Sequence, residues 1–389
     1  MKYLTRTVWL LSLVSLFTDL ASEMLYPVLP IYLKSIGFSV FLIGILEGVA
    51  EATAGLSKSY FGQWSDRLGQ RLPFVRWGYG LSALSKPMLA VLAAPWWVLL
   101  ARTVDRLGKG LRTGARDALL ADEAATGRVG AVFGFHRGLD TLGAVLGPAA
   151  ALYWLTQHPG QYRLLFLLAF IPGIVAVLAT LLIKAKPIPA SATPVRPFWA
   201  SFAYWRQAPP AYRHVAGALL IFALFNSSDA LLLLLARQQG LSDPAVLGVY
   251  IFYNLVYAVA AFPAGLLADR LGKRPLLVGG LALFAVVYAA ATQVHGWEWF
   301  GAVFGLYGLY AAATEGIGKA WLSQLCAPTD KGAALGTFAG LNSLAALLAS
   351  TVAGLLWHLQ NATLAFGISA VAAAAVAIFL AVVPVPTKH

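Results

Sequence analysis

Basic side chains recur every three or four residues inside one apolar stretch of the chain, at Arg102, Arg106 and Lys109, and Asp105 accompanies them. On a helix, this spacing places them on one face. A charge at membrane depth costs roughly 2.5–3.5 kcal/mol on insertion scales, so such a face points to a water-filled cavity or to buried ion pairs. We therefore predict that Arg102, Arg106 and Lys109 bind an anionic part of a solute. The alternative is an ion-pair network that only fixes helix packing.

Further along the stretch we expect a solvated cluster at the membrane surface, formed by Arg112, Arg116, Asp117, Asp122 and Glu123.

Paired carboxylates in the first half of the chain indicate proton chemistry. Asp19 and Glu23 are four residues apart, as are Glu47 and Glu51. A buried carboxylate rests either paired with a base or protonated, and a change between these states can drive a rearrangement of helices. The predicted proton-coupling residues are Asp19, Glu23, Glu47, Glu51, Asp105 and Asp140. A static network is again the alternative.

Ionisable residues are fewer in the second half of the chain. Glu315 and Lys319 are four residues apart, so they either pair with each other or face a charged solute. Tyr250 could stack against a solute, although aromatic residues in membrane helices more often serve packing. The predicted substrate-binding residues of this half are Asp229, Tyr250, Asn254, Glu315, Lys319 and Asn342.

The elements that carry these residues are long and apolar. Hydrophobic residues make up 59% of the chain and charged residues 11%, and the mean hydropathy is +0.74. Soluble domains contain about 25% charged residues, and a membrane-crossing helix needs about 20 apolar residues. The chain is therefore predicted to be an all-α polytopic membrane protein with twelve transmembrane helices. We place the spans near 5–34, 39–66, 73–95, 96–123, 129–157, 161–184, 213–238, 243–269, 275–295, 297–325, 331–358 and 361–384.

Basic residues are distributed unevenly between the connections. Arg67, Arg71 and Arg76 surround the turn after the second span, whereas the connections 93–96 and 293–297 contain no lysine or arginine. Cytoplasmic loops of membrane proteins are enriched in lysine and arginine, so both termini are predicted to be cytoplasmic. The net charge of +12 thus reflects orientation in a membrane, and we expect no nucleic-acid partner.

Signatures of enzymes and metal sites are missing from the sequence. It contains one cysteine and three methionines, so neither a disulfide framework nor a carrier of soft metals is expected. It has no Gly-x-x-x-x-Gly-Lys-Ser/Thr phosphate loop, which removes ATP hydrolysis as an energy source. We expect no enzymatic activity, no cofactor and no metal.

The chain repeats itself at about half its length. Residues 62–71 return as residues 265–274, and the separation 269 − 66 = 203 is close to half of 389. Residues 130–140 return in the same way as residues 332–342. A proline-rich, basic stretch lies between the copies. We therefore predict an N-terminal six-helix bundle over 1–185, a cytoplasmic linker over 186–212 and a C-terminal six-helix bundle over 213–389.

The repeated segment resembles the loop signature of the major facilitator superfamily, Gly-x-x-x-Asp-Arg-x-Gly-x-Arg. The two copies match it at Gly62, Asp66, Arg67, Gly69 and Arg71, and at Gly265, Asp269, Arg270, Gly272 and Arg274. The resemblance covers essentially the whole chain and implies that family's fold, with two pseudo-symmetric six-helix bundles that move around a central cavity. We predict that these charged turns act as gates that stabilise one conformation. Plain cytoplasmic loops are the alternative.

Two further motifs are similar to motifs of the same superfamily. The first resembles its fifth-span antiporter motif and comprises Gly134, Gly143, Gly147 and Pro148. Ala151 and Leu152 stand where that motif ends in glycines. Small residues let helices approach closely, so we predict a pivot or a seal here, with ordinary helix packing as the alternative. The second resembles the fourth-span arginine motif, with Asp105 and Arg106 in place of the usual glutamine and glycine.

These observations predict a secondary active transporter that works by alternating access. We expect proton-coupled antiport, hence efflux, of a small polar, zwitterionic or anionic solute or a drug-like molecule. The alternatives are a proton symporter that imports a small solute or siderophore-like compound, and a passive uniporter. The expected location is the bacterial inner membrane. The expected partners are the solute, protons and the lipid bilayer, with the chain acting as a monomer.

Overall fold

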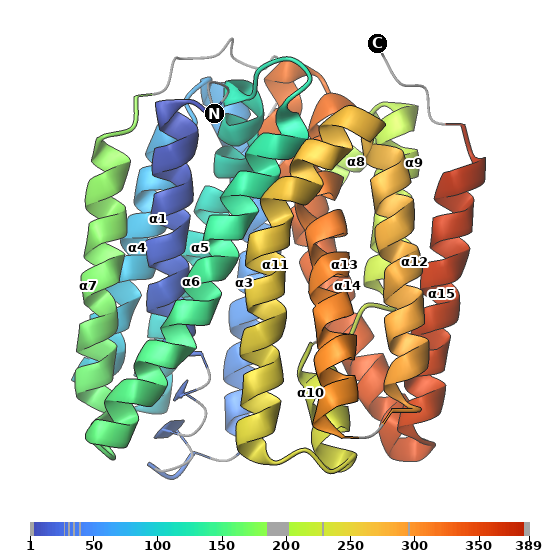
Figure 1. Cartoon of the computed structure of the whole chain (residues 1–389). Coiled ribbons are helices and arrows are strands. Elements are labelled where there is room, and N and C mark those ends of the chain that lie inside the picture. The colour runs from blue at the N-terminus through green and yellow to red at the C-terminus, as the bar shows by residue number, and fades with distance from the viewer. Residues whose placement is uncertain are drawn as a thin grey trace. The chain divides into compact units, whose positions relative to one another are not determined.

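The computed structural model describes residues 4–26, 28–29, 32–33, 36–38, 40–184, 202–227, 229–294 and 296–384. Within some helices the description covers the backbone but not every side chain, and residues 40–48 and 51–52 are of this kind. The described residues form helices joined by short connections and contain no strand (Figure 1). The predicted all-α class is confirmed.

Six long helices are described in the first half of the chain. They are α1 (Arg6–Glu23), α3 (Val40–Leu68), α4 (Leu72–Val91), α5 (Pro95–Glu123), α6 (Val129–Gln157) and α7 (Tyr162–Leu181). Thr5 caps α1, because its hydroxyl accepts the backbone N–H of Val8 at 3.3 Å. A proline lies in the first turn of both α4 and α5, where a helix has no use for the missing N–H.

The second half contains the remaining helices. They are α9 (Pro210–Ala223), α10 (Asp229–Gln238), α11 (Asp243–Leu271), α12 (Lys273–Ala291), α13 (Trp297–Gln324), α14 (Lys331–Leu359) and α15 (Ala362–Val382). Two short elements, α8 (Tyr204–Gln207) and the 3₁₀ helix η2 (Pro328–Asp330), precede α9 and α14. Asn361 caps α15, because its side-chain oxygen accepts the backbone N–H of Leu364 at 2.8 Å.

Most helices begin and end close to the predicted spans. The bounds of α6 are those predicted for the fifth span. The first span differs, because α1 ends at Glu23 and not near residue 34. The seventh span is interrupted between α9 and α10. Asn226 and Ser227 lie in this break, and such side chains compete with the helix for backbone hydrogen bonds.

Several helical segments could cross a membrane by length and composition alone. They are Tyr162–Leu181, Gly248–Leu271, Lys273–Ala291, Pro328–Trp357 and Ala362–Val382. Helix α5 is not among them because charged residues interrupt its apolar pattern. These same charged residues form a large part of the candidate site.

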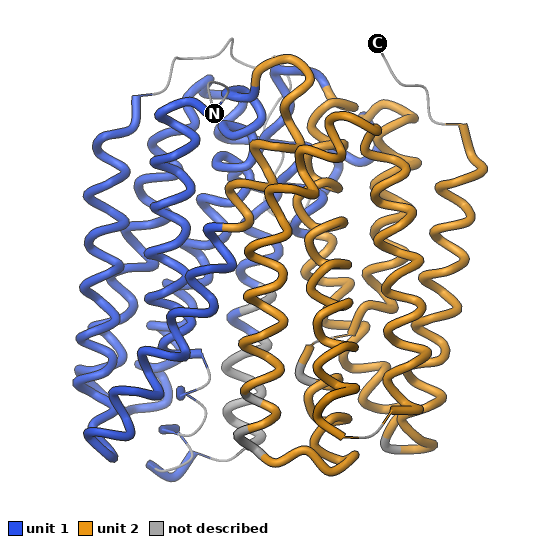
Figure 2. Tube along the Cα trace, viewed as in Figure 1, with its two compact units in different colours: residues 1–124, 139–207, 327–340 blue, residues 125–138, 208–326, 341–389 orange. Residues whose placement is uncertain are grey.

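The chain divides into two compact units (Figure 2). Unit 1 comprises residues 1–124, 139–207 and 327–340, and unit 2 comprises residues 125–138, 208–326 and 341–389. The first part of α6 therefore belongs to unit 2, and the first part of α14 belongs to unit 1. The predicted bundle boundaries at 185 and 213 remain a prediction. Residues 185–201 of the predicted linker lie outside the described residues, and the rest of it contains α8 and the start of α9.

Each unit has its own packing. In unit 1, α4 packs against α5 and α7, α5 also packs against α3, and α1 packs against α7. An apolar cluster that includes Leu29, Leu89 and Phe166 fills one part of this unit. In unit 2, α13 packs against α11 and α12, and α12 packs against α15. Aromatic rings dominate this second core, where the Phe284 ring lies 4.9 Å from that of Tyr310.

Candidate functional site

A buried ion pair joins α4 to α5 in unit 1. The Lys86 ammonium lies 2.8 Å from Asp105 Oδ1, and the Arg102 guanidinium lies 3.7 Å from Asp105 Oδ2. Lys86 also donates a hydrogen bond to Ser22 Oγ on α1 at 3.1 Å. All three charged side chains are buried. Lys86 is absent from the predicted site. A lysine inside an apolar run, next to Pro87, could have indicated a buried ion pair.

A second polar layer lies further along α5. Arg112 donates a hydrogen bond to Ser82 Oγ at 2.6 Å, and its guanidinium lies 4.5 Å above the centre of the Tyr79 ring. Ser82 in turn donates to the backbone carbonyl of Asp105 at 3.2 Å. Ser82 therefore contacts both Arg112 and the backbone of Asp105.

A third set of contacts connects α5 to α1 and α6. Arg116 pairs with Asp117 at 2.9 Å and donates to Ser15 Oγ at 3.4 Å. Ser15 donates a hydrogen bond to the carboxylate of Asp140. The predicted solvated cluster is therefore wrong in part, because Arg112, Arg116 and Asp117 are buried. Arg116 and Asp117 neutralise each other, and Arg112 contacts Ser82 and the Tyr79 ring on α4.

The predicted acids of α1 lie in this same region. Asp19 and Glu23 are half-buried and are close enough to Asp140 for their charges to interact. Lys109 acts electrostatically on both acids of α1, and Arg106 acts on Glu23. The structure thus gathers Asp19, Glu23, Asp140, Arg106 and Lys109 as one group in unit 1. The side chains of Glu47 and Glu51 lie outside the described residues.

Glycines of the fifth span allow α1 to approach α6 at these acids. A Cβ atom on Gly143 would meet the carbonyl oxygen of Leu16, and one on Gly147 would lie 2.8 Å from the carbonyl oxygen of Leu20. Pro148 follows directly inside α6. Gly134 lies in the part of α6 that belongs to unit 2. The glycine motif therefore serves two packing contacts, one in each unit.

In unit 2, a charged residue of α6 meets an acid of α13. Arg137 forms an ion pair with Glu315, and both contact the hydroxyl of Tyr257, at 2.5 Å from Arg137 Nε and 2.8 Å from Glu315 Oε2. The side chains of Arg137 and Glu315 are 32% and 39% exposed, so this pair remains accessible. Arg137 is not among the predicted substrate-binding residues, because its partners come from helices far away in sequence.

The other predicted residues of unit 2 are spread over several helices. Asn254 is buried and donates a hydrogen bond to the backbone carbonyl of Tyr250 at 3.0 Å, within α11. Lys319 and Asn342 are half-buried on α13 and α14. Asp229 begins α10 and accepts a hydrogen bond from Tyr307 at 2.8 Å. Asp229 therefore lies in a tyrosine-rich environment unlike that of the acids in unit 1.

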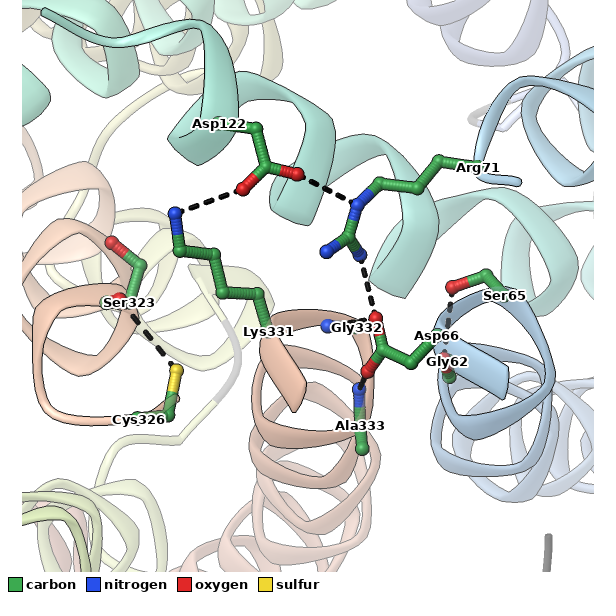
Figure 3. Close-up of polar contacts among 10 residues, drawn as sticks. All are labelled: Gly62, Ser65, Asp66, Arg71, Asp122, Ser323, Cys326, Lys331, Gly332 and Ala333. Atoms are coloured by element: carbon green, nitrogen blue, oxygen red, sulfur yellow. Dashed lines mark hydrogen bonds and ion pairs between the residues drawn. The ribbon is translucent and has the colours of Figure 1, made fainter. Parts of the chain in front are cut away.

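The first copy of the repeated turn caps a helix of the second repeat (Figure 3). The Asp66 carboxylate accepts the backbone N–H groups of Gly332 and Ala333, at 3.0 and 2.6 Å, in the first turn of α14. Arg71 donates to Asp66 at 2.8 Å and to Asp122 at 2.8 Å. Asp122 also pairs with Lys331 at 2.9 Å. We call this arrangement the first cap. A negative charge is favourable there because the N-terminus of a helix carries partial positive charge.

The second copy of the turn makes the same contact in unit 2. Asp269 accepts the backbone N–H groups of Gly130 and Ala131, at 2.9 and 2.8 Å, in the first turn of α6. Lys273 pairs with Asp269 at 3.1 Å. We call this arrangement the second cap. The two caps thus use corresponding residues of the two sequence repeats.

The arginines of the two turns have different partners. Arg71 belongs to the first cap, whereas Arg274, at the corresponding repeat position, donates to the backbone carbonyls of Leu380 and Ala381 at 2.6 and 2.7 Å. Arg67 and Arg270 are exposed. Gly69 and Gly272 have φ angles of 63° and 96°, which explains why glycine is needed where each turn leaves its helix.

Glycine pairs lie beneath both caps. In unit 1, a Cβ atom on Gly332 would lie 2.7 Å from the carbonyl oxygen of Gly62. In unit 2, a Cβ atom on Gly130 would lie 2.7 Å from the carbonyl oxygen of Gly265. Only glycine leaves room for the two backbones to approach this closely. The caps and the glycine pairs therefore act together, because the hydrogen bonds of each cap require that close approach.

The sequence of this chain matches a known protein family along nearly its whole length. The family model described as Major Facilitator Superfamily matches residues 11–255 and 216–389. The chain belongs to the Major Facilitator Superfamily. Its fold is accordingly that of the superfamily, with twelve transmembrane helices, and both the predicted family and the predicted fold class are confirmed.

Members of the Major Facilitator Superfamily resemble this chain in sequence and in structure. An MFS-type transporter of Methanocaldococcus jannaschii, described as uncharacterized, is 28% identical over 365 residues, covering 92% of this chain and 90% of the relative. The human organic anion transporter MFSD10 has a TM-score of 0.82 at 18% identity and covers 96% of this chain and 99% of its own. The Escherichia coli fucose:proton symporter FucP has a TM-score of 0.78 at 15% identity, with 96% and 97% covered.

Proteins of the superfamily are transporters rather than enzymes, and this chain is a transporter of that family. At this level of identity the two solved structures establish the shared fold alone. The roles of the individual site residues in this superfamily member remain predictions, although the structure shows which of them lie together.

Proposed function

We propose that the chain is a secondary active transporter that couples movement of a small polar solute to movement of protons. The observation that carries the proposal is the group of three acids, Asp19, Glu23 and Asp140, whose charges interact with one another and with Lys109. Adjacent like charges inside a membrane protein are costly, and proton binding relieves that cost. When such a carboxylate loses its proton, it can pair with a basic side chain on a neighbouring helix. The attraction between the two helices then changes.

The proposed solute carries a negative charge or is zwitterionic. Arg102, Arg106 and Lys109 follow one face of α5 in unit 1. Guanidinium groups bind carboxylate and phosphate in a bidentate manner, which favours an anionic group on the solute. The similarity in fold to a human organic anion transporter supports this choice of solute.

The two caps are proposed to stabilise one conformation of the transport cycle. Each cap joins a carboxylate of one repeat to backbone N–H groups of the other. Rigid-body movement of one repeat against the other would break these hydrogen bonds together, which gives a two-state contact. The cytoplasmic position proposed for the turns follows from their basic residues.

The glycine motif of α6 favours antiport and therefore export. A proton symporter is the second candidate, and the similarity in fold to a fucose:proton symporter supports it. A passive uniporter would need the acids only for packing. The proposed location is the inner membrane of a bacterium, with the chain active as a monomer.

Reconstituted vesicles that contain a pH-sensitive dye test the coupling. A panel of organic anions, zwitterions and sugars, fucose included, is added outside, and both solute uptake and internal pH are followed. Antiport predicts that solute entry drives proton exit, and symport predicts that protons enter with the solute. Solute movement without any change in pH would show a uniporter and overturn proton coupling.

Variants connect the activity to the acids. We expect Asp19→Asn and Asp105→Asn to abolish coupled transport while the protein still reaches the membrane. Glu298→Gln is the matched control, because Glu298 is an exposed carboxylate in the first turn of α13. Full transport rates in Asp19→Asn, Asp105→Asn and Arg106→Gln would show that the charged network is only structural.

A further inference from the structure

The interruption of the seventh span places the polar side chains of Asn226, Ser227 and Asp229 inside an otherwise apolar stretch, where they are buried or half-buried. Helix α9 ends at Ala223 and α10 begins at Asp229, inside a stretch whose sequence predicts one continuous span. Irregular backbone inside a membrane protein persists only where protein buries it or where it lines a cavity, and interrupted helices often hold ions at such points. The groups that surround the interruption therefore determine whether it is packed or lines a cavity.

Two residues of the break, Asn226 and Ser227, and the first residue of α10, Asp229, each contact a different tyrosine of unit 2. Asn226 Nδ2 lies 3.1 Å from the hydroxyl of Tyr310, and Asp229 Oδ1 lies 2.8 Å from that of Tyr307. Ser227 Oγ lies 3.4 Å from the hydroxyl of Tyr288. The rings of these tyrosines adjoin one another, at 5.2 Å between Tyr307 and Tyr310 and 6.1 Å between Tyr288 and Tyr307. Carboxylate, amide and hydroxyl oxygens therefore gather around the break.

The group contains one carboxylate, that of Asp229, and no base in the described part of the chain forms an ion pair with it. Among the described residues, the hydrogen-bond partners of Asp229 are tyrosine hydroxyls and backbone. The charged groups of α10 and α13 include Glu315, which pairs with Arg137, and the basic residues Arg237 and Lys319, neither of which forms an ion pair with Asp229. The acids of unit 1, in contrast, lie beside lysine or arginine, as Asp105 does beside Lys86.

One acceptor in the group is also unsatisfied. The side-chain oxygen of Asn226 is buried and receives no hydrogen bond within the described part of the chain. A buried acceptor of this kind usually has a donor, a water molecule or an ion as its partner. The neighbouring Tyr310 hydroxyl already accepts from the amide nitrogen of Asn226. The unsatisfied oxygen and the unneutralised carboxylate therefore both point to a missing positive partner.

We propose that the break between α9 and α10 is a binding site for a sodium ion, held by Asn226, Ser227 and Asp229 with the hydroxyls of Tyr307 and Tyr310 nearby. Sodium is a hard cation that prefers oxygen ligands, and its single charge matches the single carboxylate. The site is separate from the proton-coupling acids proposed in unit 1. It stands whether or not transport is driven by protons.

Thermal unfolding of the purified full-length protein tests the site directly. The melting temperature is measured as sodium chloride replaces choline chloride at constant ionic strength, with potassium chloride as a second series. A ligand that binds only the native state raises the melting temperature in a saturable manner. We expect sodium to do so and choline not to. A wild-type protein whose melting temperature ignores sodium, or follows pH alone, would overturn the proposal.

Variants place the effect at the break. Asp229→Asn removes the charge but keeps an oxygen for Tyr307, so it should fold and lose the sodium response. Asn226→Ala should raise the half-saturating sodium concentration by about tenfold or more. Glu298→Gln, which removes an exposed carboxylate of the same unit, should respond like the wild type. A wild-type response in Asp229→Asn would exclude the site. The measurement needs no gradient and no solute, so it fails or succeeds independently of the proposed transport mechanism.

Discussion

Asp66 and Gly332 are 266 residues apart in sequence, yet the carboxylate of one accepts the backbone N–H of the other at 3.0 Å. The second repeat reproduces the contact between Asp269 and Gly130 at 2.9 Å. The surroundings differ, because the first cap includes Arg71, Asp122 and Lys331. The two caps are therefore equivalent in backbone geometry and unequal in charge.

The first cap should contribute more to stability than the second. Asp66→Ala removes two helix-capping hydrogen bonds, a loss of about 1 kcal/mol each, and also removes one of the two acids that pair with the buried Arg71, so that Asp122 alone remains beside it. Asp269→Ala should cost less, because Lys273 can reach water. Melting temperatures of the two variants in detergent decide the order. Equal losses, or a larger loss in Asp269→Ala, would contradict the inequality of the caps.

The glycines beneath the caps should not tolerate a methyl group. A Cβ atom on Gly336 would meet the carbonyl oxygen of Lys58, and one on Gly134 would meet that of Ala261. We expect Gly336→Ala and Gly134→Ala to destabilise the protein by about 1–3 kcal/mol, because the backbones must separate.

Matched controls exist in the same helical environment. Gly279 and Gly354 have no atom within 4 Å of an added Cβ. Gly279→Ala and Gly354→Ala should be neutral or slightly stabilising, since alanine favours helix. Similar melting temperatures for all four variants would show that close approach is unimportant.

The pair formed by Lys86 and Asp105 should behave as one unit. Lys86→Met leaves a buried carboxylate and Asp105→Leu leaves a buried ammonium, each at a cost of about 3–5 kcal/mol. The double variant should be more stable than the sum of the two losses predicts. A double-mutant cycle based on unfolding measures the difference. Additive losses would mean that the two side chains do not depend on each other.

The pair formed by Arg137 and Glu315 should affect transport more than stability. Because about a third of each side chain is exposed, we expect Glu315→Gln to change the free energy of unfolding by no more than about 1 kcal/mol. Transport in vesicles should nevertheless fall. A large loss of stability with normal transport would make this pair a structural element only.

Most of the fold follows from patterns that are local in sequence. The apolar run at 129–157 and its flanking turns are sufficient to place both ends of α6. The sequence repeat related Asp66 to Asp269 and Gly130 to Gly332 as equivalent positions, although it did not predict that they are in contact. The break in the seventh span was not predicted, since two polar residues in an apolar run do not by themselves end a helix.

The missed site residues share a physical reason. Lys86 and Arg137 have partners on helices distant in sequence, and no spacing rule brings such residues together. The burial of Arg116 and Asp117 was also missed, because the helices that cover these side chains, such as α1 with Ser15, are distant in sequence. Periodicity shows which face of a helix carries charge, whereas the neighbouring helices determine whether that face meets water.

Joining both caps in one polypeptide has an evolutionary consequence. In a homodimer of six-helix chains, symmetry would make every substitution appear in both caps at once. In a single chain, each copy can mutate alone, and the two arginines do differ: Arg274 contacts the backbone carbonyl of Leu380, whereas Arg71 pairs with Asp66. With both repeats in one chain, a substitution can therefore change the strength of the first cap without weakening the second cap.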